Sequence, residues 1–146
     1  MTTPRSIRFD PGVVSRLADY VARRPGLSGA SVAARLVDEG LRMEEHPGVI
    51  FRDGPAGRRA TLVGGPDVWE VIRAVRSARE AEPDLSESEL LALVEMNSGL
   101  SPRQLRTAVD YWGAYPAEVD ALVKHADRME AAGQAATERT EALFRR

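Results

Sequence analysis

The segment Arg5–Phe9 constrains the fold of this chain more than any other feature. Polar and apolar residues alternate along it, in the order Arg5, Ser6, Ile7, Arg8 and Phe9. This alternation is the period-2 pattern of a half-buried β-strand. Helical patterns follow it at once, so its own neighbourhood offers no second strand that could accept its backbone hydrogen bonds. The partner strand must therefore come from elsewhere.

Two helices are predicted directly after this strand. Asp10 and Pro11 predict the first helix, because aspartate is a favoured N-cap and proline fits the first helical position. Apolar residues then recur at helical spacing until Pro25, and Ser28 caps a second helix that ends at His46. One short strand and two helices in about 45 residues lie near the lower size limit for an independent hydrophobic core.

Both difficulties disappear if two copies of the chain pair their strands and interleave their helices. The two strands would form an antiparallel ribbon with Ile7 and Phe9 on a shared core and with Ser6 and Arg8 facing outward. The residues expected in this dimer core are Ile7, Phe9, Leu17, Val21 and Leu36.

Three local patterns stand in a fixed order between residues 4 and 43: the alternating strand, the helix start at Asp10-Pro11, and Gly26-Leu27-Ser28 before the second helix. In this order the chain resembles the ribbon-helix-helix family of DNA-binding proteins, of the Arc, MetJ and CopG type. The resemblance implies a homodimer whose ribbon enters the major groove and whose second helix binds a phosphate at its N-terminus. The residues that it implies in DNA contact are Arg5, Ser6, Arg8, Ser28, Gly29 and Ala30.

The charge distribution agrees with this resemblance better than the net charge does. The whole chain carries a formal charge of -2, which argues against a nucleic-acid binder. Residues 1–35, however, hold six arginines against two aspartates, a net charge of +4. By the resemblance, Arg8 faces outward from the ribbon and can form a bidentate contact with a guanine.

The residues after His46 predict a β-hairpin followed by a small helical domain. Val49–Arg52 and Ala60–Val63 flank a turn at Asp53–Gly57 that contains glycine and proline. Ser86 and Glu89 match a capping box. Helix starts are predicted at Asp67, Ser86, Ser101 and Ala117.

Residues 84–113 predict a possible second DNA contact. They form a helix, a turn at Gly99 and a second helix, which resembles a helix-turn-helix. Arg103, Gln104 and Arg106 lie on the expected exposed face of the second helix. Two arguments oppose this hypothesis. Residues 66–98 carry a net charge of -5, which repels phosphate, and the same geometry is a common way to pack small helical domains.

The hairpin and the helices after it resemble a second family between Pro47 and Val123. The carriers of this resemblance are Val49–Gly64, Pro66–Ile72, Ala108–Trp112 and Pro116–Asp120. The family is a small, helix-turn-helix-like domain of uncharacterised function, found alone or fused behind DNA-binding segments in type II antitoxins of the VapB kind in bacteria. The resemblance implies a toxin with a PIN-like nuclease domain, encoded by a neighbouring gene, as a partner.

The C-terminal segment predicts a helix with one weak apolar stripe. Small or apolar residues recur there at alternating spacings of three and four, at Val119, Leu122, Ala126, Met129, Gly133, Ala136, Thr140 and Leu143. One hypothesis is that this helix lies in a groove of the toxin, with Met129, Leu143 and Phe144 as contacts. The alternative is an amphipathic tail that packs on its own domain.

The sequence offers no pattern for catalysis, a cofactor or a metal. There is no cysteine, and neither His46 nor His125 has a second ligand at metal-binding spacing. No apolar stretch approaches the roughly 20 residues that span a bilayer, and the N-terminus lacks the apolar core of a secretory signal. We therefore expect a cytoplasmic protein that is not an enzyme and does not bind a membrane.

The sequence as a whole predicts a mostly α fold in three parts. Residues 1–45 form a ribbon-helix-helix that intertwines as a dimer, residues 46–123 a β-hairpin with a helix-turn-helix-like domain, and residues 124–146 a C-terminal helical tail. The expected function is a DNA-binding antitoxin that represses its own operon and neutralises a PIN-like nuclease toxin. Its partners are then double-stranded promoter DNA, a second copy of itself and the toxin. The alternatives are a stand-alone ribbon-helix-helix transcriptional regulator and a protein-interaction module that does not bind DNA.

Overall fold

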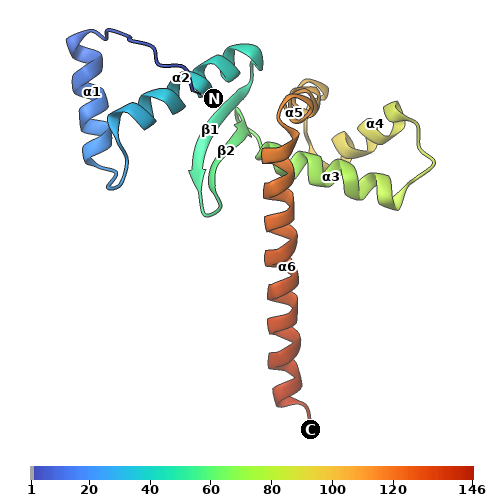
Figure 1. Ribbon diagram of the computed structural model, residues 1–146. Helices are drawn as coiled ribbons and strands as arrows, with labels where there is room; N and C mark the ends of the chain where they lie inside the picture. Colours follow the sequence, from blue (N-terminus) through green and yellow to red (C-terminus); the bar gives the residue numbers. More distant parts are fainter. Residues whose placement is uncertain (1) are drawn as a thin grey trace. The chain divides into compact units, whose positions relative to one another are not determined.

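The computed structural model describes residues 2–146 and contains six helices and one two-stranded antiparallel sheet, so the chain is mostly helical as predicted (Figure 1). The chain divides into two compact units, one ending at Arg42 and the other spanning Met43–Arg146. The elements are α1 (Pro11–Ala22), α2 (Gly29–Glu45), β1 (Val49–Gly54), β2 (Gly57–Leu62), α3 (Val68–Ala81), α4 (Glu87–Ser98), α5 (Pro102–Ala114) and α6 (Pro116–Phe144).

The first unit consists of α1, most of α2 and the segment that precedes them. Both helices begin where the sequence predicts, with Pro11 at the first position of α1 and Ser28 before α2. The side chain of Asp10 makes no capping bond, but its carbonyl oxygen accepts the N–H groups of Val13 and Val14 and so starts the helix. The local signals at both helix starts are therefore sufficient to position them.

The predicted strand over Arg5–Phe9 is not formed in the single chain, where these residues have no regular secondary structure. The prediction of a strand is wrong for one copy, and the reason is the one that the sequence raised. A strand is stabilised by hydrogen bonds to a neighbouring strand, and one chain supplies no neighbour for this segment. Residues 2–10 are all exposed.

The second unit begins with the predicted β-hairpin. β1 and β2 pair antiparallel, with Val49 opposite Leu62 and Gly54 opposite Gly57. The turn is shorter than predicted, because β1 extends to Gly54 and β2 begins at Gly57, so that only Pro55 and Ala56 lie between the strands. Gly57 takes the left-handed φ of +102° that favours glycine. At Gly54 a Cβ would displace the guanidinium of Arg59, which donates to the carbonyl oxygen of Asp53 at 2.6 Å.

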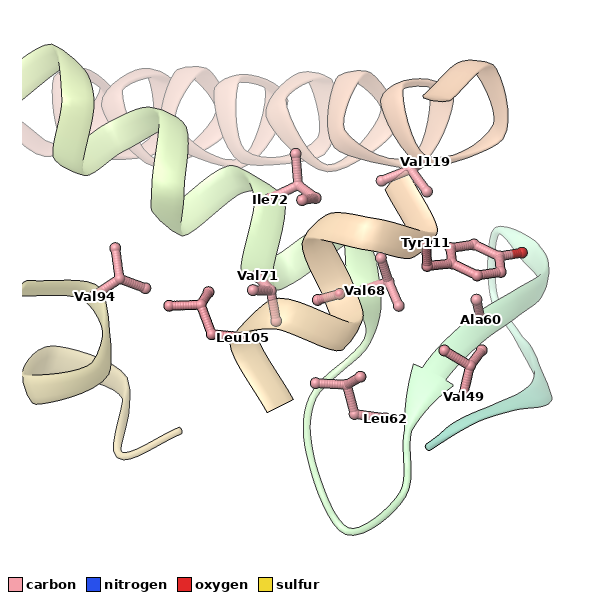
Figure 2. Packing of buried hydrophobic residues seen from close by; sticks show 11 residues of the cluster. Val49, Ala60, Leu62, Val68, Val71, Ile72, Val94, Leu105, Tyr111 and Val119 are labelled. Atoms are coloured by element: carbon pink, nitrogen blue, oxygen red, sulfur yellow. The ribbon is translucent and has the colours of Figure 1, made fainter. Parts of the chain in front are cut away.

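Helices α3 and α5 pack on each other and on β2, and the hydrophobic core lies between them (Figure 2). Tyr111 is completely buried in this core, and its hydroxyl donates to a carboxylate oxygen of Glu118 at 2.9 Å. That bond satisfies the one polar group that the aromatic ring brings inside. The buried members of the cluster are Val49, Ala60, Leu62, Val68, Val71, Ile72, Val94, Leu105, Ala108, Tyr111 and Val119.

Capping boxes fix the starts of α3, α4 and α5. In α4 the predicted pair is present, since Ser86 Oγ accepts the N–H of Glu89 at 3.3 Å and Glu89 accepts the N–H of Ser86 at 2.8 Å. α4 ends at Gly99 in the left-handed conformation, as its place in the predicted turn suggests. α5 and α3 start with equivalent boxes.

Helix α6 is held against α3 and α5 by polar contacts on its exposed side. Asp120 accepts the indole N–H of Trp112 at 2.9 Å and a guanidinium N–H of Arg76 at 2.7 Å. About two turns further along α6, Asp127 pairs with Arg73 of α3 at 2.9 Å, and Glu130 pairs with the same guanidinium. α6 runs without interruption past residue 124, so the predicted C-terminal tail is the continuation of this helix.

The contacts of Asp120 generate a prediction about stability. The bond from Trp112, followed by the one from Arg76, lowers the pKa of this carboxyl below its usual value, so its contribution is present above the unfolded pKa of about 3.9 and is lost as the pH falls through the folded value. We expect Asp120→Asn to lower the free energy of unfolding by about 1 kcal/mol at pH 7 and by less near pH 2.

Urea unfolding at the two pH values measures this difference. Asp110→Asn is the matched control, since Asp110 is an exposed aspartate of α5, and its effect should stay within about 0.5 kcal/mol. Equal losses for the two variants at pH 7 would contradict a specific role for Asp120.

Candidate nucleic-acid interface

The predicted ribbon residues all precede α1 and are exposed. Arg5, Ser6 and Arg8 lie on the surface with Ile7 and Phe9 between them. Large apolar side chains are rarely left in water without a reason, and Ile7 keeps 62% of its surface exposed and Phe9 41%. The segment thus offers both basic and apolar side chains, and the single chain covers neither kind.

An open apolar groove of about 380 Å³ lies between α1 and α2 in the first unit. Three of the five residues predicted for the dimer core, Phe9, Leu17 and Leu36, line it, whereas Ile7 and Val21 do not. Along Pro11–Ala22 no side chain is buried. The full lining is Phe9, Val13, Arg16, Leu17, Tyr20, Ala33, Leu36 and Val37.

Tyr20 joins the two helices of this unit through arginines. The guanidinium of Arg35 on α2 donates to the Tyr20 hydroxyl at 2.6 Å, and the guanidinium of Arg24 lies 3.6 Å from the centre of the same ring. Arg35 also pairs with Glu39 at 3.8 Å. Arg35 therefore links α2 to α1, and Arg24 packs on the same ring from just after α1, so two of the six arginines in residues 1–35 are engaged by Tyr20. Sequence reasoning missed this cluster, because the spacing between Tyr20 and Arg35 follows no helical or strand period.

The N-terminus of α2 has the geometry that the phosphate hypothesis needs. The N–H of Ser31 is taken by Ser28 Oγ at 3.1 Å, and the N–H of Val32 by the Ser28 carbonyl oxygen at 3.1 Å. The first N–H groups of a helix lack an acceptor within it, and those of Gly29 and Ala30 find none among the described residues 2–146. Such groups, at the positive end of the helix dipole, are favourable for an anion.

The second predicted DNA contact is less well organised. Arg103 and Arg106 are exposed on α5, as expected. Gln104 is engaged in the capping box, where its side-chain oxygen accepts the N–H of Ser101 at 3.0 Å. Arg106 faces Glu87 of α4 at 4.0 Å, an exposed pair that weakens its field toward a phosphate. The three residues are close in sequence, but their side chains do not act as one basic group.

The C-terminal half of α6 extends from its unit without packing on it (Figure 1). From Asp127 to Arg146 every residue is exposed except Ala135, which is half-buried. Met129, Leu143 and Phe144 are among the most exposed large apolar residues, at 61%, 76% and 77%. The alternative of a tail packed on its own domain therefore does not describe this helix.

His46 lies among aromatic side chains. His46 follows α2, and its ring packs edge-on against Tyr111 and Tyr115 with ring centres 5.3 and 5.8 Å away. Residues 2–146 contain no group of three or more metal-ligating side chains. In the same part of the chain, none of the helices combines the length and the apolar character needed to cross a bilayer.

Comparison with known proteins adds no assignment, since no family model, curated protein or solved structure matches this chain. The candidate interface therefore rests on the residues of this chain alone.

Proposed function

We propose that this protein is a homodimeric DNA-binding antitoxin that represses its own operon and neutralises a PIN-like nuclease toxin through its C-terminal half. The observation that carries the proposal is the pairing of an uncovered apolar groove with a basic segment beside it. Phe9 belongs to both, since it lines the groove and immediately follows Arg8.

A second copy is the occupant that best fits the groove between α1 and α2. A helix pair in which one member has no fully buried side chain is too small to be stable alone, because folding in water depends on removing apolar surface. A second copy brings the same apolar side chains and the missing strand in one step. Pairing of two Arg5–Phe9 segments would satisfy their backbone groups and place Ile7 and Phe9 over the shared core.

Dimerisation also creates the charge that DNA binding needs. Two copies bring about +8 together from residues 1–35, and pairing the segments in a ribbon would place Ser6 and Arg8 of both on its outer face. The backbone N–H groups of Gly29 and Ala30 would then bind the phosphates that flank the ribbon. Arg8 would then recognise a base, and the N-terminus of α2 would set the position of the protein along the DNA backbone.

The exposed end of α6 supports the antitoxin part of the proposal. An isolated helix without tertiary contacts is marginal in water, and the residues after Ala126 make few contacts with the rest of their unit. Met129, Leu143 and Phe144 would lie in a groove of the toxin, which would stabilise the helix on binding.

Two observations outside the chain distinguish this proposal from its alternatives. A toxin-like reading frame beside the gene favours an antitoxin, and its absence favours a stand-alone regulator. Dimers that show no salt-dependent affinity for DNA would support a pure protein-interaction module.

The dimer is tested by shortening one groove residue. Leu36 lines the groove and is 43% exposed in the single chain. We expect Leu36→Ala to weaken dimerisation by about 2 kcal/mol, or about 30-fold in the dissociation constant, because a contact buried in the dimer is lost. Sedimentation equilibrium measures the constant. Met96→Ala, an exposed apolar residue of α4, should leave it unchanged. A dimer that tolerates both changes equally does not use this groove.

DNA binding is tested by gel shift with the promoter of the protein's own operon. We expect Arg8→Ala to weaken specific binding by about 1–3 kcal/mol, roughly 5- to 150-fold, and to affect unrelated DNA less, because a bidentate base contact is lost. Arg128→Ala, which changes an exposed arginine of α6, is the control and should bind normally. Absence of any shift at low salt would refute the repressor, and an equal loss on all sequences would reduce Arg8 to a phosphate contact.

Toxin binding is tested by co-expression with the product of the adjacent reading frame. We expect the double variant Leu143→Ala, Phe144→Ala to lose most of the co-purified toxin, since these side chains supply the apolar anchor. Thr137→Ala, on an exposed position of the same helix, should retain it. If the double variant binds toxin as well as the unchanged chain, the toxin contact lies elsewhere.

A further inference from the structure

A second open groove, of about 510 Å³, lies between α3 and α4, and the proposed function leaves it unused. Small side chains of α3 form one wall and the C-terminal half of α4 forms the other. A volume of this size is typical of sites that accept several apolar side chains. The lining is Ala74, Ser77, Ala78, Ala81, Glu82, Leu93, Val94, Asn97 and Ser98.

One end of this groove is acidic. Glu82 lines it, and Glu80 and Asp84 are exposed on either side of Glu82 in the chain. No lysine or arginine is among the lining residues. The nearby Arg79 is directed to the backbone, where it donates to the carbonyl oxygens of Pro83 at 3.0 Å and Leu85 at 2.6 Å. An occupant should therefore combine apolar side chains with positive charge at one end.

The C-terminal end of α6 has this combination. Leu143 and Phe144 are two of the most exposed apolar side chains in the described chain, and Arg145 and Arg146 follow them directly. Arg145 pairs with Glu141 at 3.8 Å, but both side chains are largely exposed, so that pair is easily exchanged. The C-terminal end of α6 thus matches the groove both in its apolar side chains and in its charge.

The end of α6 cannot reach the groove of its own chain. The last buried residue of the helix is Val123, and Phe144 lies 21 residues further along, or about 30 Å at the rise of an α-helix. Figure 1 shows the helix continuing straight away from α3 and α4 to its end. The occupant must come from another copy.

We propose that the C-terminal end of α6 from a second copy docks in the groove between α3 and α4, with Leu143 and Phe144 on the small side chains and Arg145 and Arg146 toward Glu82. The contact is a helix-in-groove interaction that links copies through their second units. It does not depend on the DNA-binding proposal. Because it uses the same Leu143 and Phe144 that the toxin would bind, a toxin and a second copy would compete for this end of α6, so the contact applies to the purified protein without either partner.

The absence of cysteine from the sequence permits a direct crosslinking test. One full-length copy carries Ala81→Cys in the groove, and a second, distinguished by a size tag, carries Ala142→Cys beside the apolar anchor. After mixing and mild oxidation, we expect a disulfide-linked pair of the two copies that a thiol reductant separates. Adding Phe144→Ala to the second copy should reduce the yield at least fivefold.

Matched alanine positions supply the controls. Ala92→Cys replaces the groove cysteine with one on an exposed position of α4 outside the groove, and Ala132→Cys replaces the tail cysteine with one ten residues earlier on α6. Either replacement should give only background crosslinking. Yields equal to those of the controls, or a yield that Phe144→Ala leaves unchanged, would overturn the proposal. A gel shift on the same samples reports DNA binding separately, so failure of one proposal is distinguishable from failure of the other.

Discussion

The burial of apolar surface differs between the two units of this chain. The second unit has a complete hydrophobic core, and the first unit does not. In the second unit, Tyr111 and Ala108 are fully buried, and the one polar group of Tyr111 is satisfied by Glu118. In the first unit, α1 buries nothing and the side chains of Phe9 and Leu36 remain about two-fifths exposed. Burying one such side chain fully is worth about 1.5–3 kcal/mol, which is large beside the few kcal/mol that keep a small domain folded. The proposed dimer and its ribbon would remove this deficit.

The helices and the hairpin could be predicted because their signals are local. A capping residue acts on N–H groups two or three positions away, so Ser86 and Ser101 fix the starts of α4 and α5 whatever surrounds them. The hairpin could be predicted for the same reason, since its two strands are separated only by a short turn. The strand at Arg5–Phe9 failed in the single chain for the complementary reason. Alternation indicates which side chains would share a face of a strand, but it carries no information about whether a neighbouring strand is present to form the hydrogen bonds.

The candidate interface was only partly predictable, because a sequence shows how many charged residues a region holds but not which groups their side chains contact. Arg24 and Arg35 were counted in the basic region together with Arg8, yet the guanidinium groups of both contact Tyr20. Gln104 was assigned to an exposed recognition surface, yet its oxygen caps α5. These are contacts between side chains whose spacing or geometry has no periodic signature. Leu17 and Leu36 were expected in one dimer core, and both line the same groove, because helical periodicity assigns residues to a face even when their partner is unknown.

The continuity of α6 changes how its end can act. A tail separated from the domain by a hinge would have to be ordered by each partner at a cost in conformational entropy. Here the first turns of α6 are anchored by the buried side chains of Val119 and Val123 and by the bonds that Arg76 and Trp112 make to Asp120. Arg73 extends this attachment to Glu130. The core thereby holds the first turns of α6 up to Glu130. A partner, whether a toxin or a second copy, therefore has to stabilise only the turns beyond Glu130, and it binds a helix whose first half is already attached to α3 and α5.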